Sequence, residues 1–309
     1  MVKSIKIYNN FDIKLKHKNS IILIGNFDGL HLGHQKLFRL AQNFKKKYSF
    51  NIGVLTFEPM PKMFFNKNLK NFRISNQKQK ISLIKKFNVD FIIVKKFDKR
   101  FSKTKSINFI KEILSKKLGA KFIFVSNNFR FGNKREGNVK QLIKLENLYK
   151  YKIVKPKPLS QNQKIISSTF IRNLLETGNL DKANKFLNRK WSILGKVIKG
   201  RQLGKKIGFP TANIDIKDYI AAKPGVYAVK VKKENSLKYV KGIANLGYRP
   251  TFNQKKILLE VHLFNFSENL YNKYLTVNFL KFIRKEKKFK NIDQLKKQIK
   301  KDLQKAKKI

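Results

Sequence analysis

Two histidines, His31 and His34, lie three residues apart in the stretch IILIGNFDGLHLGHQKL, just past a glycine-rich turn. Two imidazoles aimed at one triphosphate would donate hydrogen bonds to the negative charge that develops in a transition state. Two other interpretations compete with this one. A zinc site would need more ligands than Asp28, the one further candidate in the stretch, and a purely structural turn would need no ligand. The pattern favours phosphate chemistry over both.

Three glycines of the same stretch, Gly25, Gly29 and Gly33, support that interpretation. They end or follow an apolar, β-branched run over residues 21–25, which predicts a buried strand. In a doubly wound sheet, ligands bind beyond the carboxyl ends of the strands, where a glycine-rich turn brings backbone N–H groups and a helix N-terminus onto a phosphate. The sequence therefore predicts a nucleotide cradle at this turn.

A second group of candidates lies in IISSTFIR, residues 165–172. Ser168 and Thr169 supply hydroxyls at the expected start of a helix, and Arg172 follows one turn later as a fork that can bind phosphate. A serine or threonine at a helix start is commonly a structural cap, so this segment gains meaning only together with the other motifs.

In the second half of the chain, a glycine-rich segment precedes FPTAN and predicts a flap whose backbone can approach phosphates. Thr211 and Asn213 then offer a hydroxyl and an amide oxygen, which suit Mg²⁺, although an ordinary β-turn is the competing interpretation. Glu260 is the one acid in the apolar run ILLEVHL and a candidate general base, with an outward-facing, solvated glutamate as the alternative. The glycines are Gly195, Gly200, Gly204 and Gly208.

Two kinds of element must position these residues. In the first part of the chain, apolar β-branched runs alternate with segments of helical periodicity. This alternation predicts a parallel sheet covered by helices on both faces. Strands are predicted at 21–25, 52–57, 91–97 and 121–126, and helices at 33–47, 77–87 and 107–119.

The pattern of residue types changes after Arg189, where short β-rich runs are separated by Gly, Pro and Asn. These runs predict an antiparallel sheet curled into a small barrel, and the segment from Asn291 onward predicts a lysine-rich amphipathic helix. The predicted fold class is α/β. We expect a Rossmann-like domain with a parallel sheet at residues 1–186, and an antiparallel β-barrel domain with a terminal helix at residues 187–309.

The 309-residue chain holds no cysteine, which excludes disulfides, thiolate zinc sites and thiol nucleophiles. No run approaches the roughly 20 apolar residues of a membrane span, and lysines interrupt the N-terminal segment too often for a signal peptide. We therefore expect a soluble, cytoplasmic protein with no membrane partner.

The formal net charge of +54 raises the question of nucleic acid as a partner. The lysines are spread over every segment and do not form one stripe, and arginine, the preferred reader of bases and phosphates, is scarce. A biased coding composition explains the charge without selection for a ligand. We therefore do not expect nucleic acid to be the partner, whereas small anions such as nucleotides would still be drawn to the surface.

The string GNFDGLHLGHQKL resembles the nucleotidyltransferase signature, and in its GxFDGxHxGH form it is similar to the adenylyltransferase domain of bacterial bifunctional riboflavin kinase/FAD synthetases. VLTFEPMP, NNFRFGNKREG and IISSTFIR are similar to further motifs of that domain. The resemblance implies that His31 and His34 hold and polarise ATP phosphates while a phosphate of the second substrate attacks the α-phosphorus and pyrophosphate leaves. The nucleotide-binding residues that it implies are Gly25, Phe27, Asp28, Gly29, Gly33, Asn128, Ser168, Thr169 and Arg172.

The strings GFPTAN, GVYAV, GIANLGYRPTF and LLEVHLFNF resemble the riboflavin kinase domain of the same family, in the family's order. This resemblance implies that Thr211 and Asn213 coordinate Mg²⁺ with ATP. It also implies that Glu260 draws the proton from the ribityl 5′-hydroxyl as that hydroxyl attacks the γ-phosphate. The nucleotide-binding residues implied here are Gly204, Gly208, Pro210, Thr211 and Asn213.

The resemblance covers nearly the whole chain, and it implies a bifunctional enzyme that converts riboflavin to FMN and FMN to FAD, with ATP as co-substrate and Mg²⁺ as cofactor. Two alternatives stay open. One is a riboflavin kinase whose first domain is degenerate or serves another nucleotidyl transfer. The other is a basic nucleic-acid-binding protein on a nucleotide-binding fold, whose binding would depend on salt.

Several positions depart from the family pattern, but none of them removes a predicted catalytic group. The remaining histidines, His17 and His262, are expected to be structural. The main departures are Met60, Ser126, Lys205, Asn265 and Asn272.

Overall fold

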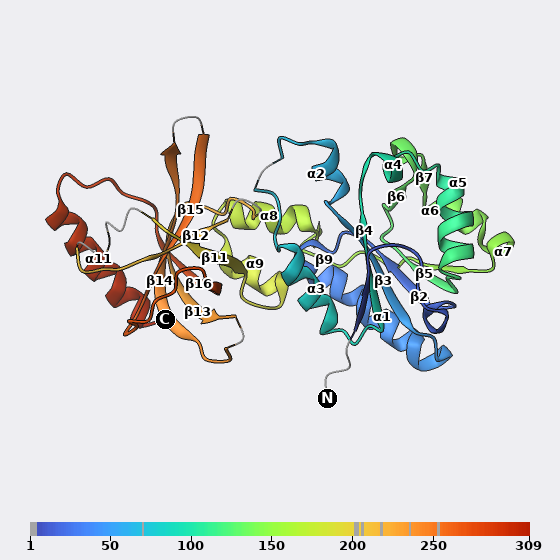
Figure 1. Ribbon diagram of the computed structural model, residues 1–309, viewed down its shortest axis with the longest axis horizontal. Coiled ribbons are helices and arrows are strands. Elements are labelled where there is room, and N and C mark those ends of the chain that lie inside the picture. The colour runs from blue at the N-terminus through green and yellow to red at the C-terminus, as the bar shows by residue number, and fades with distance from the viewer. Residues whose placement is uncertain are drawn as a thin grey trace. The chain divides into compact units, whose positions relative to one another are not determined.

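The computed structural model describes residues 5–69, 71–200, 204, 207–216, 219–234, 236–251 and 254–309 (Figure 1). The chain divides into two compact units, one made of Met1–Leu69 with Gln77–Ile166 and the other of Lys70–Asn76 with Ser167–Ile309. Residues 167–186 are therefore grouped with the second unit by their contacts, whereas the domain boundary at residue 186 that the sequence suggests stays a prediction. Lys205 lies outside the described residues.

The first unit is built on a six-stranded parallel sheet in the order β1-β4-β3-β2-β5-β8. All four predicted strands are present, which confirms the parallel sheet. The outer strands β1 and β8 escape prediction, because three residues are too few to show a periodic pattern. The strands are β1 (Lys6–Tyr8), β2 (Ile21–Ile24), β3 (Ile52–Glu58), β4 (Phe91–Lys96), β5 (Phe122–Phe124) and β8 (Lys152–Val154).

Helices cover both faces of this sheet, as predicted (Figure 1). Successive residues of a strand point to opposite faces, so β2 contributes Ile21 and Leu23 to one core and Ile22 and Ile24 to the other. The first core packs against α1 (Leu32–Tyr48) and α3 (Gln77–Lys85). The second packs against the π-helical η3 (Phe109–Lys117), which continues from α5 (Ser106–Asn108), and against α6 (Val139–Lys144).

Short elements complete the first unit. They are η1 (Leu15–His17), η2 (Asp28–Leu30), α2 (Pro61–Phe65), α4 (Lys99–Ser102), η4 (Asn133–Arg135), α7 (Glu146–Tyr149), and the paired strands β6 (Arg130–Phe131) with β7 (Gly137–Asn138) and β9 (Ser160–Gln161) with β10 (Lys164–Ile165).

Two residues that stand out in the sequence, a histidine expected to be structural and a methionine that departs from the family pattern, are buried in this unit. His17 is buried, with its Nδ1 atom 2.8 Å from the Tyr8 hydroxyl, and Met60 is buried directly before α2.

The strand order identifies the edge where a ligand belongs. From β2 the chain proceeds to β3 and β4 on one side, and then crosses to β5 on the other side of β2. The direction of winding therefore reverses between β2 and β5, and the loops that leave the carboxyl ends of these two strands diverge. In open α/β sheets a ligand binds in the crevice at such a point.

The second unit begins with two helices and continues into a closed barrel in the order β11-β12-β15-β14-β13-β16. Every pairing in the barrel is antiparallel, which confirms the predicted architecture. The elements are α8 (Ser168–Glu176), α9 (Leu180–Leu187), β11 (Ser192–Ile198), β12 (Ala212–Asp215), β13 (Gly225–Lys233), β14 (Val240–Thr251), β15 (Gln254–Leu263), β16 (Tyr274–Arg284) and α11 (Ile292–Lys307).

Large aromatic side chains fill the barrel. Trp191 and Tyr227 both pack on Phe279, with ring centroids 4.6 Å and 5.1 Å apart. Burial raises the pKa of the Tyr227 hydroxyl, which donates a hydrogen bond to the carbonyl of Lys223. The hydroxyl of this buried tyrosine thus has the hydrogen-bond partner that it requires.

A buried ion pair fastens the terminal helix α11 to the barrel. The Arg284 guanidinium at the end of β16 donates to both carboxylate oxygens of Asp302, at 2.7–3.0 Å. Gln298 donates a further hydrogen bond to Asp302, which is 1% exposed. Removing one partner of such a pair leaves the other charge buried without compensation.

We predict that Asp302→Ala lowers the free energy of unfolding of the barrel unit by about 3–5 kcal/mol, because Arg284 would lose its buried counter-ion. Asp293→Ala is the matched control, since Asp293 lies on the same helix but is exposed, and it should cost less than about 1 kcal/mol. Denaturant unfolding of both variants measures the difference. Equal midpoints for the two variants would contradict the role of this pair.

Candidate functional site

The turn between β2 and α1 has an unusual backbone. Phe27, Gly29 and Leu30 have φ angles of 47°, 73° and 39°, in the left-handed region. Glycine adopts this conformation easily, whereas phenylalanine and leucine do so only where the surrounding structure holds them. Both side chains are 1% exposed, so the core packs firmly around them. Backbone held in such a conformation is a common feature of ligand-binding turns.

His31 and His34 form a stacked pair at the start of α1. Their ring centroids are 3.8 Å apart with 24° between the planes, and Phe27 contacts His34 edge-on at 5.3 Å. His31 is the N-cap residue of α1 and is 4% exposed, while His34 is half-buried. The two imidazoles and the positive end of the helix dipole are therefore concentrated at the carboxyl edge of β2, an arrangement suited to an anion.

Gly33 is required for this pair by steric fit. A Cβ atom at Gly33 would lie 2.9 Å from the carbonyl oxygen of Ile166 and 3.1 Å from two atoms of the His31 ring. Gly25 is similarly confined, since a Cβ atom there would lie 3.1 Å from the Phe27 ring. The glycines that the sequence singles out therefore permit the close packing of the turn, in addition to any approach of a ligand to the backbone.

Asn128 lies in the loop that follows β5, the neighbour of β2. Because the two strands are parallel and pair Leu23 with Phe124, both loops leave from the same edge of the sheet. Ser126 is one of the departures from the family pattern. Its hydroxyl donates a hydrogen bond to the Asn128 side-chain oxygen at 2.9 Å. The structure therefore brings Asn128 and the histidine turn to one edge.

A cavity of about 460 Å³ opens at this loop, and Asn128, Arg130 and Arg135 are among the residues that line it. The two arginines are not among the site residues that the sequence predicts. Their positions in NNFRFGNKREG, within the motif that contains Asn128, are the signal that could have found them. Two guanidinium groups beside an amide suit a phosphate or another planar anion.

The candidates Ser168, Thr169 and Arg172 belong to the second unit, at the start of α8. The preceding residue, Ser167, caps the helix, because its hydroxyl accepts a hydrogen bond from the Phe170 amide at 3.2 Å. Thr169 is exposed and Ser168 is half-buried. The predicted helix start is therefore confirmed, while the phosphate contacts stay predictions.

Arg172 has a contact that the sequence does not suggest. Its Nε atom donates to the Phe72 carbonyl at 2.8 Å, and its guanidinium lies 3.6 Å from the centre of the Phe72 ring. The two residues are 100 positions apart in the chain, so local sequence could not reveal this pairing. Arg172 therefore holds residue 72 in place in addition to any role toward phosphate.

The barrel aligns a row of three polar residues across neighbouring strands. Glu260 on β15 is the register partner of Asn213 on β12 and of Asn245 on β14. Residues directly opposite one another point to the same face of a sheet, so the carboxylate lies between two amides. Asn213 is 5% exposed, and Glu260 and Asn245 are half-buried.

This row faces outward from the barrel. The next residue in the row is Val226, which packs in the cluster that contains Ala306 of the covering helix α11, while the sequence neighbours Leu259 and Val261 are 0% and 1% exposed on the opposite face. Glu260 thus points outward, as the alternative interpretation of a solvated glutamate predicts. It differs from a solvated surface glutamate because it is half-buried beside Asn213 and Asn245.

Glycines make room for the oxygen atoms beside this row. A Cβ atom at Gly200 would lie 2.3 Å from the amide nitrogen of Asn213, and one at Gly204 would lie 3.3 Å from the Thr211 hydroxyl. Gly208 has a φ angle of 87°, which favours glycine. His262 binds the Pro210 carbonyl through Nδ1 at 2.8 Å and so fastens the start of β12, as expected for a structural histidine.

The residues present fit a magnesium ion. The Asn213 side-chain oxygen is buried and has no hydrogen-bond partner among the described residues. A Cβ atom at Gly200 would lie 2.9 Å from this oxygen, so the glycine leaves space beside it, and Mg²⁺ prefers such hard oxygen ligands. The described part of the chain holds no cluster of three His, Cys, Asp or Glu residues, so a cation here would also need oxygens from a bound phosphate.

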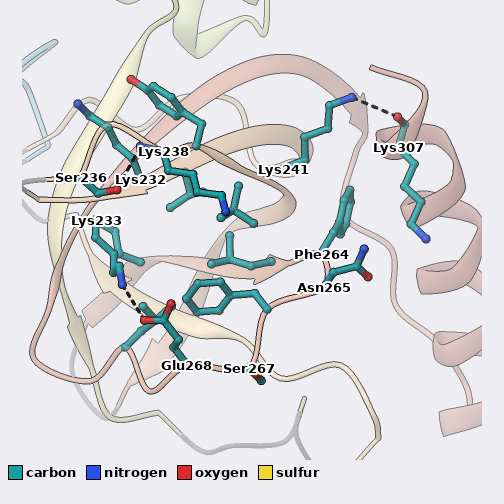
Figure 2. Close-up of a pocket in the computed structure, with 17 residues that line it drawn as sticks. Lys232, Lys233, Ser236, Lys238, Lys241, Phe264, Asn265, Ser267, Glu268 and Lys307 are labelled. Atoms are coloured by element: carbon teal, nitrogen blue, oxygen red, sulfur yellow. Dashed lines mark hydrogen bonds and ion pairs between the residues drawn. The ribbon is translucent and has the colours of Figure 1, made fainter.

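A larger cavity, of about 740 Å³, lies at the end of the barrel where β15 finishes (Figure 2). Lysines surround it, and Lys233 pairs with Glu268 at 2.6 Å, while Lys241 donates to the Lys307 carbonyl at 3.5 Å. Phe264 and Asn265 also contribute to its wall, but none of the predicted kinase residues lines it. The sequence does not predict this cavity, because its lysines resemble those elsewhere in the chain.

Among the described residues, no helix has the length and apolar character needed to cross a membrane.

Comparison with known families supports two successive domains. Residues 13–170 match the family model described as FAD synthetase, and residues 187–309 match the model described as riboflavin kinase.

Curated relatives match almost the whole chain. Proteins named bifunctional riboflavin kinase/FMN adenylyltransferase are 42% identical in Buchnera aphidicola subsp. Acyrthosiphon pisum, over 94% of each chain, and 36% identical in Escherichia coli K12, over 91% of this chain and 90% of that one. A crystal structure described as a macrolide-efflux protein from Streptococcus pneumoniae is similar with a TM-score of 0.84 and 29% identity, over 96% of each chain.

Proposed function

The chain belongs to the family of bifunctional riboflavin kinases/FMN adenylyltransferases, and from that premise we propose which residues carry out its two reactions. The enzyme phosphorylates riboflavin to FMN and adenylylates FMN to FAD, with ATP as co-substrate in both steps. One observation carries the assignment: each matched domain contains its own set of groups suited to phosphate, the stacked histidines in the first and the Asn213–Glu260 pair in the second.

In the adenylylation reaction of the N-terminal domain, an oxygen of the FMN phosphate attacks the α-phosphorus of ATP, and pyrophosphate leaves. His31 and His34 hold the triphosphate and donate hydrogen bonds to the charge that accumulates on it. No covalent enzyme intermediate is required, because positioning and electrostatic stabilisation suffice. The residues proposed to bind the nucleotide in this reaction are Gly25, Phe27, Asp28, Gly29, Gly33, Asn128, Ser168, Thr169 and Arg172.

In the phosphorylation reaction of the C-terminal domain, the ribityl 5′-hydroxyl of riboflavin attacks the γ-phosphorus of ATP, and ADP leaves. Glu260 accepts the hydroxyl proton, and its half-buried position beside two amides supports this role. Thr211 and Asn213 would hold Mg²⁺, which neutralises phosphate charge when bound. Gly204, Gly208 and Pro210 shape the adjoining flap.

The cytoplasm is the proposed compartment, because both reactions consume ATP and the cysteine-free sequence suits a reducing environment. The partners follow from the reactions: riboflavin, FMN, FAD and ATP.

The alternatives of a kinase with a degenerate first domain and of a nucleic-acid-binding protein are not favoured, since both family models match.

We predict that Glu260→Gln lowers FMN formation by about 10²- to 10⁴-fold, because the glutamine cannot accept the hydroxyl proton. FAD formation from supplied FMN should stay at the wild-type rate. Incubation with ATP and Mg²⁺, followed by chromatographic separation of the flavins, measures both activities. Glu176→Gln, an exposed residue of α8, is the matched control. Retention of FMN formation in Glu260→Gln would refute this assignment.

The converse prediction concerns the double variant His31→Ala with His34→Ala. It should lower FAD formation from FMN by about 10²-fold or more, because donors to the transition-state charge are lost. FMN formation from riboflavin in the same sample is the internal control and should not change. A parallel fall of both activities would show that the two sites are not independent.

A third prediction concerns the proposed magnesium site. Gly200→Ala should raise the Mg²⁺ concentration needed for half-maximal FMN formation, because the added methyl group would displace the Asn213 amide. Titration of the kinase activity with MgCl₂ measures the shift. Lys199→Ala, an exposed neighbour, should leave the curve unchanged. Identical curves for both variants would argue against Asn213 as a ligand.

A further inference from the structure

A buried lysine lies on α3, the helix that packs against the turn between β2 and α1. Lys80 on α3 is 2% exposed, and its ammonium group lies 3.2 Å from the Thr56 hydroxyl and 3.4 Å from the Phe57 carbonyl. Both acceptors are at the carboxyl end of β3, the strand next to β2. Lysine is rarely buried to this extent, because removing the ammonium from water is costly. The resemblance that identifies the other site residues assigns no role to Lys80.

Thr56 extends this contact to the turn itself. Its side chain is fully buried, and its hydroxyl donates to the Asn26 carbonyl at 3.4 Å. A hydroxyl that accepts a hydrogen bond from a cation becomes a better donor, so the two bonds reinforce each other. Three segments that are distant in sequence, α3, β3 and the turn, are thereby joined by one chain of hydrogen bonds, of which the Lys80 end is buried and the Asn26 end is part-buried.

The position of Asn26 gives this chain its significance. Asn26 immediately precedes Phe27, the first residue of the turn in the left-handed region. Such backbone persists only when the surrounding structure holds it, and α3 also packs on η2, the turn's short helical segment. Fixing the Asn26 carbonyl therefore helps to fix the backbone path from the end of β2 to His31.

We propose that Lys80 is a positioning residue for adenylyl transfer, which acts through Thr56 and Asn26 to hold the turn that presents His31 and His34 to the triphosphate. This inference rests on the proposed function of the two histidines. Lys80 itself need not contact a substrate. Its effect is on the placement of groups that stabilise the transition state, where an error of about 1 Å can cost on the order of 10²-fold in rate.

The test compares Lys80→Met, which keeps the length of the side chain but removes its charge, with Lys85→Met, an exposed lysine of the same helix. We expect Lys80→Met to lower kcat for FAD formation from FMN by about 10- to 100-fold with a smaller change in KM for ATP. FMN formation by the same molecules and the kinetics of Lys85→Met should be unchanged. Unaltered kcat in Lys80→Met would overturn the proposal.

A second pair of variants keeps the test decisive if Lys80→Met fails to fold. Thr56→Val removes the hydroxyl with little change of shape, whereas Thr56→Ser retains it. We expect Thr56→Val to lower kcat for FAD formation and Thr56→Ser to restore most of it, with both variants unfolding at similar temperatures. Equal kcat values for the two variants would overturn the relay.

The double histidine variant separates this proposal from the one on which it rests. If it retains FAD formation, the proposed role of the histidines fails, and the inference about Lys80 fails with it. If it loses FAD formation while Lys80→Met and Thr56→Val behave as wild type, the histidine assignment stands and only the role of Lys80 is refuted.

Discussion

The first site depends on one constraint, the left-handed backbone of the turn between β2 and α1. Phe27 and Leu30 do not adopt positive φ angles without external support, and the structure supplies it by burying both side chains. The same turn sets where α1 begins and therefore how His31 and His34 stack. A flexible loop with the same residues would offer imidazoles to a phosphate, but it would not hold both of them in one place.

In the barrel, strand register has the role that the turn has in the first unit. Asn213 and Glu260 are 47 positions apart in the numbering, yet pairing of β12 with β15 places them directly opposite each other. A slip of one residue would turn the glutamate to the face occupied by Leu259 and Val261. Closure of the barrel prevents such a slip, because each strand is bonded on both sides.

The sequence predicts elements with long apolar runs or strong helical periods, such as β2, β3 and α1. It also predicts site residues that stand together in short motifs. It does not predict contacts made by residues far apart in the chain, because no local pattern records them. The stacking of Arg172 on Phe72 and the hydrogen bonds of Lys80 are of this kind. The outward direction of Glu260 required the barrel register, which composition does not contain.

The high positive charge attracts anions, but it cannot by itself select among them. The chain has 72 lysine and arginine residues against 18 acidic residues, and lysines are spread along the whole sequence as well as around the 740 Å³ cavity. Such a field raises the local concentration of any phosphate-bearing molecule. Selection must come from groups with fixed geometry, such as the stacked imidazoles and the Asn213 oxygen. A buried lysine such as Lys80 differs physically from the surface lysines, because its charge acts at low dielectric on a defined set of atoms.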